Sequence, residues 1–200
     1  LLLLTGLNRW KIVLGKFATL WGLSAVTFVS LLPYVVVRYL VGGIEWWHEA
    51  ACAATVLGGS AMIGAGAIGA SAFRGIGARV AVLLLFLASM MGGCAPPLFG
   101  SAMVTDGCGV FYHVTALAAV GCYTLTGLAL ARSRLRLAVM AYEVKPSGMM
   151  IGMLVFAPFV IGMFTAFTVG FGGIVGLLLM ALTAARLDIT PGVPAPPVEY

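Results

Sequence analysis

Charged side chains are scarce in this chain. Asp, Glu, Lys and Arg together make up 8% of its 200 residues, against about 25% in soluble domains. Hydrophobic residues reach 62%, and the mean hydropathy is +1.13. A chain with so little charge cannot cover a water-facing surface, and its apolar residues stand in long unbroken runs. The sequence therefore predicts an all-α integral membrane protein, a polytopic bundle of transmembrane helices.

Motifs that carry their own chemistry are also missing. No GxxxxGK[ST] phosphate-binding loop is present, because Gly15 and Lys16 lack both the upstream glycine and the following Ser or Thr. His48 and Glu49 lack the second histidine of an HExxH zinc motif. The four cysteines show no CxxC spacing: they are Cys52, Cys94, Cys108 and Cys122. We therefore expect no catalytic, cofactor or metal site on this chain, and no ATPase site of its own.

Apolar runs long enough to cross a bilayer, about 20 residues each, predict five to six transmembrane helices within residues 17–186. Their expected bounds are about 12–41, 50–73, 80–99, 110–131, 149–168 and 174–186. Glycines interrupt the last apolar block, which is either a tight hairpin of two helices or one long tilted helix. The proline-rich residues 187–200 predict a disordered cytoplasmic tail. Pro33 is expected to bend the first span.

The basic residues stand at the ends of the apolar runs, so the net charge of +5 indicates membrane orientation and not nucleic-acid binding. Most of them fall on one side of the predicted spans: Arg9, Lys11, Lys16, Arg74, Arg79, Arg132, Arg134, Arg136 and Lys145. Glu45, Glu49 and Asp106 fall on the other side, together with Arg38. The positive-inside rule makes the basic side cytoplasmic. We expect a bacterial inner membrane protein with both ends in the cytoplasm.

Small residues recur every four positions in the second span, at Ala61, Ala65 and Gly69. Such spacing lets two helix backbones approach closely in a membrane. One interpretation is ordinary intramembrane packing, and the other is a helix that slides against a neighbour during transport.

Polar residues on the side opposite the lysines are the remaining candidates for function. Arg38 and Glu45 are expected either to form an ion pair at the interface or to contact an anionic substrate on its path. His113 is either an interfacial residue or part of a proton relay. Cys94 and Cys108 flank Pro96 and Pro97, in a predicted loop, and are either free thiols or a disulfide.

Residues 1–16 form a half-polar segment before the first complete span. The leucine run breaks at Thr5 and Gly6, and Asn8 restarts the chain with a side chain that can cap a helix. Trp10 and the lysines suit the headgroup region. These features predict a cytoplasmic interfacial segment that turns into a span. On physical grounds alone it could be a plain membrane anchor.

The stretch LLLLTGLNRWKIVLGKF, residues 1–17, resembles the segment before the third transmembrane helix of ABC-2 type transporter permeases. The leucine run, Thr-Gly-Leu, the capping asparagine, the basic-aromatic pair and Ile-Val-Leu-Gly-Lys all match. Residues 31–43, LLPYVVVRYLVGG, resemble the proline-containing outer half of the same helix. Lys11 stands where many members carry a glutamate, which removes the capping box with Asn8.

The resemblance implies a permease subunit, N-terminally truncated here, since two helices precede this segment in the family. It implies an ATP-binding cassette ATPase subunit as partner, which carries ATP and Mg²⁺, and a second permease subunit. It also implies that one segment couples the permease to the ATPase: Leu4, Thr5, Gly6, Leu7, Asn8, Arg9, Trp10, Lys11 and Lys16. The substrate stays open.

Two other functions remain open from the residues alone. An intramembrane lipid-modifying enzyme or protease would use polar groups at one depth, and His48, Glu49, Asp106 and His113 are the candidates. A scaffold that transports nothing would need none of them.

Overall fold

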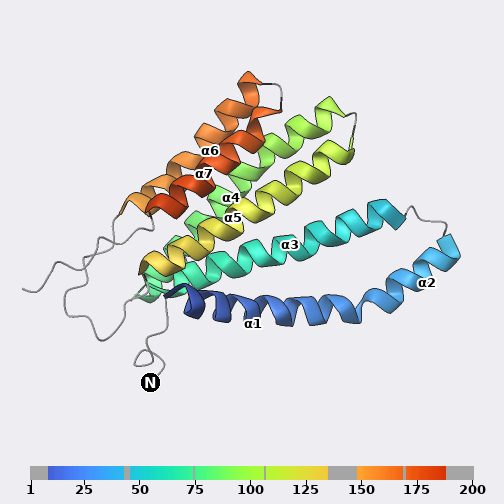
Figure 1. Cartoon of the computed structure of the whole chain (residues 1–200), viewed down its shortest axis with the longest axis horizontal. Helices are drawn as coiled ribbons and strands as arrows, with labels where there is room; N and C mark the ends of the chain where they lie inside the picture. Colours follow the sequence, from blue (N-terminus) through green and yellow to red (C-terminus); the bar gives the residue numbers. More distant parts are fainter. Residues whose placement is uncertain are drawn as a thin grey trace, which may run out of the picture.

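A computed structural model describes residues 9–42, 46–73, 75–105, 107–134, 148–168 and 170–187. This part of the chain is helical and has no strand (Figure 1): α1 Arg9–Ser30, α2 Leu32–Gly42, α3 Trp46–Ser71, α4 Ile76–Val104, α5 Val110–Arg134, α6 Met149–Phe167 and α7 Gly172–Leu187. The prediction of an all-α bundle of five to six membrane-spanning helices is confirmed. Five helical stretches are long and apolar enough to cross a membrane, with α1 and α2 counted as one, and α7 is a shorter apolar helix.

The α1–α2 stretch bends and then leaves the bundle. The helix breaks at Leu31, between Ser30 and Leu32, two positions before Pro33. Proline has no N–H to donate to the carbonyl of Val29, and its ring disfavours a continuous helix. Beyond the bend α2 has no buried residue and lies away from the helices that form the bundle (Figure 1).

Helices α3 and α5 run in the same direction and touch backbone to backbone. A Cβ atom added to Gly127 on α5 would lie 2.7 Å from the carbonyl carbon of Ala65 and 2.9 Å from the amide nitrogen of Gly66. One turn further along, a Cβ on Gly69 would lie 3.0 Å from the carbonyl oxygen of Gly127. The predicted small-residue face of α3 is therefore used for close packing, which replaces the hydrophobic driving force that is absent between helices in lipid.

Prolines and glycines interlock on the other side of the bundle. Pro96 and Pro97 lie inside α4, so the expectation of a loop there is wrong. Pro97 is buried, and Gly173 of α7 has no room for a Cβ because Pro97 occupies the space. A Cβ on Gly100 would lie 2.8 Å from the Cα of Gly170. Prolines are tolerated in membrane helices when neighbouring helices enclose the interrupted turn.

The last apolar block forms two helices that lie side by side (Figure 1). Gly170 has a φ of 101°, which favours glycine, and its amide donates to the carbonyl of Thr165 at 3.0 Å. The amide of Gly172 donates to Oγ1 of Thr168 at 2.5 Å, at the start of α7. Of the two interpretations of this block, the structure therefore has the hairpin of two helices and not the single tilted helix.

The core lies where α4, α5, α6 and α7 meet. Its largest fully buried side chains include Phe86, Tyr123, Leu154, Ile161 and Leu177. The Tyr123 hydroxyl donates to the backbone carbonyl of Ser89 at 2.6 Å, which satisfies a polar group inside the bundle.

We predict that Gly127→Leu lowers the free energy of unfolding by about 2 kcal/mol or more, because its side chain would meet the α3 backbone. Gly121→Leu on the same helix is the control, since no other helix approaches a Cβ there. SDS-induced unfolding followed by circular dichroism measures both. Equal stability of the two variants would contradict close α3–α5 packing.

Candidate functional site

The predicted coupling segment is only partly described. Leu4, Thr5, Gly6, Leu7 and Asn8 lie outside the described residues. Arg9 begins α1, and Trp10, Lys11 and Lys16 follow in its first turns. Both lysines are exposed, whereas Trp10 is half-buried. The described part of the segment therefore presents its two lysines outward and turns the Trp10 ring toward the bundle.

The first turns of α1 are held by a small cluster of buried side chains, which we name the anchor cluster. It joins α1 to the ends of α3 and α5 and comprises Val13, Ala65, Leu128 and Ala131, with Trp10, Phe17 and Ile68 packed around them. Val13 is 1% exposed, although most of α1 faces outward. The guanidinium carbon of Arg132 lies 5.6 Å from the centroid of the Trp10 ring, a cation–π contact between α1 and α5.

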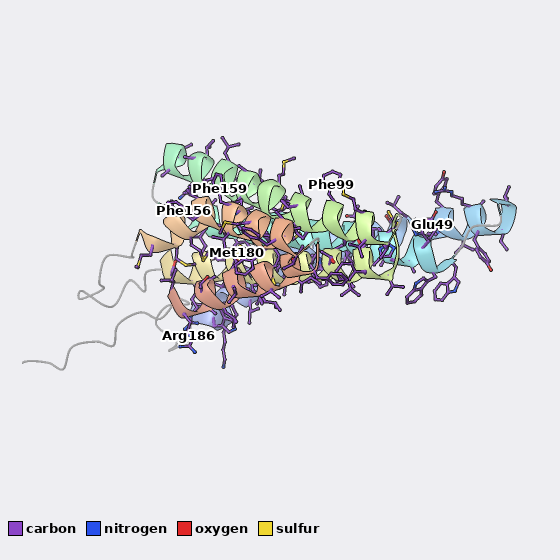
Figure 2. All side chains as sticks on the ribbon, turned by 90° about the horizontal axis from the view of Figure 1, so that it is seen from above. Glu49, Phe99, Phe156, Phe159, Met180 and Arg186 are labelled. Atoms are coloured by element: carbon purple, nitrogen blue, oxygen red, sulfur yellow. The ribbon has the colours of Figure 1, made fainter. Side chains whose placement is uncertain are left out.

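The anchor cluster lies at the basic end of the bundle, on the left of Figure 1. We define this end by the cationic side chains described there: Lys11, Lys16, Arg79, Arg132 and Arg186. The Nε of Arg79 donates to the carbonyl of Phe73 at 2.7 Å and thereby closes the turn between α3 and α4. Arg186 and Glu49 lie at opposite ends of the bundle (Figure 2).

The opposite end, which we name the aromatic end, carries Trp46, Trp47, Phe111 and Tyr112 at the starts of α3 and α5. Aromatic residues of this kind favour the membrane–water interface. A membrane-spanning orientation with one basic and one aromatic end therefore agrees with the helix lengths and the charge distribution.

Arg38 on α2 pairs with a carboxylate of α3. Its Nη1 lies 3.5 Å from Oε1 of Glu49, and the two side chains are 59% and 31% exposed. Glu45, the partner considered from the sequence, lies outside the described residues. The pair links α2 to the aromatic end of the bundle, where α2 has no buried side chain of its own.

Two histidines that the sequence assigned to the same side of the membrane come together at the aromatic end. The ring centroids of His48 on α3 and His113 on α5 lie 5.6 Å apart. The Sγ of Cys52 lies 3.8 Å from Nε2 of His48, and the Tyr112 ring lies 5.5 Å from His113. Sequence reasoning missed this pair because it depends on α3 and α5 being neighbours that run in the same direction. The shared signal was an aromatic residue directly before each histidine.

The described residues show no group of three or more His, Cys, Asp or Glu side chains placed to hold a metal ion. The four cysteines are free, with Cys94 half-buried and Cys108 exposed, so the disulfide considered for these two is not formed. Asp106 lies outside the described residues.

We predict that Glu49→Gln and Arg38→Gln each change the free energy of unfolding by less than about 1 kcal/mol, because the pair is partly exposed. In SDS-induced unfolding, the double variant should match either single one within the same margin. A coupling energy above about 2 kcal/mol would instead make the pair a structural tie of α2.

Comparisons of the chain with protein-family models, with curated proteins and with solved structures give no match. Support for a function therefore comes from the residues themselves. It consists of the basic end, the anchor cluster and the resemblance of the first residues to one family of permeases.

Proposed function

We propose that this chain is the membrane-spanning permease subunit of an ABC-2 type transporter. ATP and Mg²⁺ bind to a separate ATP-binding cassette ATPase subunit, and the permease moves a substrate across the membrane by changing conformation. The basic end faces the cytoplasm of a bacterial cell, by the positive-inside rule.

The observation that carries this proposal is the anchor cluster. A segment that receives force from an ATPase must be fixed to helices that line the membrane path. Val13 and Trp10 fix the start of α1 to Ala65 of α3 and to Leu128 of α5. A displacement of the start of α1, at Trp10 and Val13, is therefore passed directly to two central helices, because packed side chains transmit small shifts.

A second permease subunit is the proposed neighbour of the α1–α2 stretch. α2 has no buried residue within this chain, and α1 faces outward over most of its length. A helix that leaves its own bundle inside a membrane gains packing partners when another subunit lies beside it.

We predict that the double charge reversal Arg9→Glu and Lys11→Glu lowers the amount of copurifying ATPase by at least about tenfold, because like charges at an interface disfavour association. Arg186→Glu, at the same end but on α7, should leave it unchanged. Purification from the native host with quantitative mass spectrometry measures this. Unchanged ATPase association in the double variant would show that the segment is only a membrane anchor. Absence of an ATPase from the wild-type preparation would contradict the proposed function.

We predict that Val13→Trp keeps the ATPase bound but lowers the ATP hydrolysis rate of the complex several-fold. Val13 is 1% exposed, and overpacking such a position costs about 1–3 kcal/mol, which loosens α1 from α3 and α5. Leu14→Trp is the matched control because Leu14 is 38% exposed. If both variants hydrolyse ATP at the wild-type rate in proteoliposomes, the anchor cluster does not couple the subunits.

A further inference from the structure

An elongated apolar groove runs along α3 and α4 and reaches the start of α5. Its volume is about 440 Å³, within the range of about 300–1,000 Å³ that small-molecule sites occupy. Residues on all three helices line it, among them Met62, Met90, Met91, Cys94, Leu98 and Tyr112. Methionine side chains are flexible and polarizable, and they adapt to an irregular apolar ligand.

The extent of the groove along α4 matches the thickness of one leaflet of a bilayer. Along α4 it extends from Met90 to Ala102, which is about 18 Å at the rise of an α-helix. Half of a bilayer core is about 15 Å thick. α4 begins at Ile76 at the basic end, so the groove occupies the half toward the aromatic end. Phe99, which lines it, lies along this part of α4 in Figure 2.

The groove ends beside the histidine pair. Tyr112 lines the groove, and its ring centroid lies 5.5 Å from that of His113, which in turn lies 5.6 Å from His48. The Nδ1 atom of His113 is buried and makes no hydrogen bond within the described residues. Imidazole N–H groups are hydrogen-bond donors to an anion, and the two histidines lie next to Tyr112, on the side of the groove where an apolar ligand would carry its polar end.

Among the described residues, the charges near the histidines are compatible with a bound anion. Glu49 is the one carboxylate among the described residues, and Arg38 Nη1 lies 3.5 Å from it. The remaining neighbour, Cys52, places its Sγ 3.8 Å from Nε2 of His48. Because Glu49 is paired with a guanidinium, its repulsion of a phosphate beside His48 is reduced.

We propose that this groove binds one acyl chain of a phospholipid from the leaflet at the aromatic end, and that His48 and His113 hydrogen-bond the phosphate of its headgroup. An apolar groove with two hydrogen-bond donors beside its Tyr112 end suits an amphiphile with one anionic group. This site does not depend on the transport function proposed above, because it needs neither ATP nor a partner subunit.

Photolabelling tests the acyl-chain part. The full chain is reconstituted in phosphatidylglycerol vesicles that contain a phosphatidylglycerol with a diazirine in its acyl chain, and cross-linked peptides are mapped by mass spectrometry. Labelling should concentrate on the α3 and α4 residues of the groove over Phe156 and Phe159 of α6 (Figure 2), which are 67% and 74% exposed and do not line the groove. Equal labelling of groove and α6 would overturn the proposal.

A groove-filling variant sharpens the test. Ala95→Trp fills the groove and should lower groove labelling about tenfold, a loss of about 1.4 kcal/mol of binding. Ala88→Trp is the control, because Ala88 is exposed on the same helix and does not line the groove. If Ala95→Trp fails to fold, Ala102→Trp at the far end of the groove replaces it. Unreduced groove labelling in a folded variant contradicts the site.

Competition on the unaltered chain tests the headgroup part. Phosphatidic acid and diacylglycerol with the same acyl chains differ only in the phosphate, and phosphatidic acid should compete about tenfold better for the label, since hydrogen bonds to charged groups are strong. The double variant His48→Ala and His113→Ala should remove this difference. Equal competition by the two lipids in the wild-type chain would overturn the headgroup assignment. Displacement of the label by inorganic phosphate alone would show a free-ion site and would also overturn it.

Discussion

Helices α3 and α5 meet backbone to backbone, and most of the fold depends on that contact. Gly127 has no space for a side chain against Ala65 and Gly66. Because α3 and α5 run in the same direction, α4, which joins them in sequence, runs back the opposite way. The prolines of α4 pack against α6 and α7. Close contacts of small residues thus take the part that hydrophobic burial takes in water.

The α3–α5 contact also determines which residues meet at the two ends of the bundle. At the basic end, the neighbouring ends of α3 and α5 provide Ala65, Leu128 and Ala131, which receive Val13 of α1. At the aromatic end, the starts of the same two helices bring His48 and His113 within 5.6 Å. The proposed coupling site and the proposed lipid site therefore lie at opposite ends of one helix pair.

The helical membrane fold could be predicted from the sequence, because long apolar runs in lipid have few alternatives to helix. Predictions from short stretches of sequence were less reliable where contacts between helices determine the structure. Pro96 and Pro97 indicated a loop, but they lie inside α4, where Pro97 packs against Gly173. The carboxylate described beside Arg38 is Glu49, whereas the expected Glu45 lies outside the described residues, so that pairing stays a prediction. The histidine pair could not be predicted, because hydropathy does not say which helices are neighbours.

In the proposed transporter, the start of α1 moves with a bound ATPase and carries the bundle with it. Spin labels at Gly15→Cys and Met163→Cys, both exposed positions, report the distance between α1 and α6 in a chain whose exposed Cys52 and Cys108 are replaced by serine. In the complex with its ATPase, ATP and Mg²⁺ should shift that distance by about 2 Å or more. An identical distance distribution with and without ATP would contradict the claim.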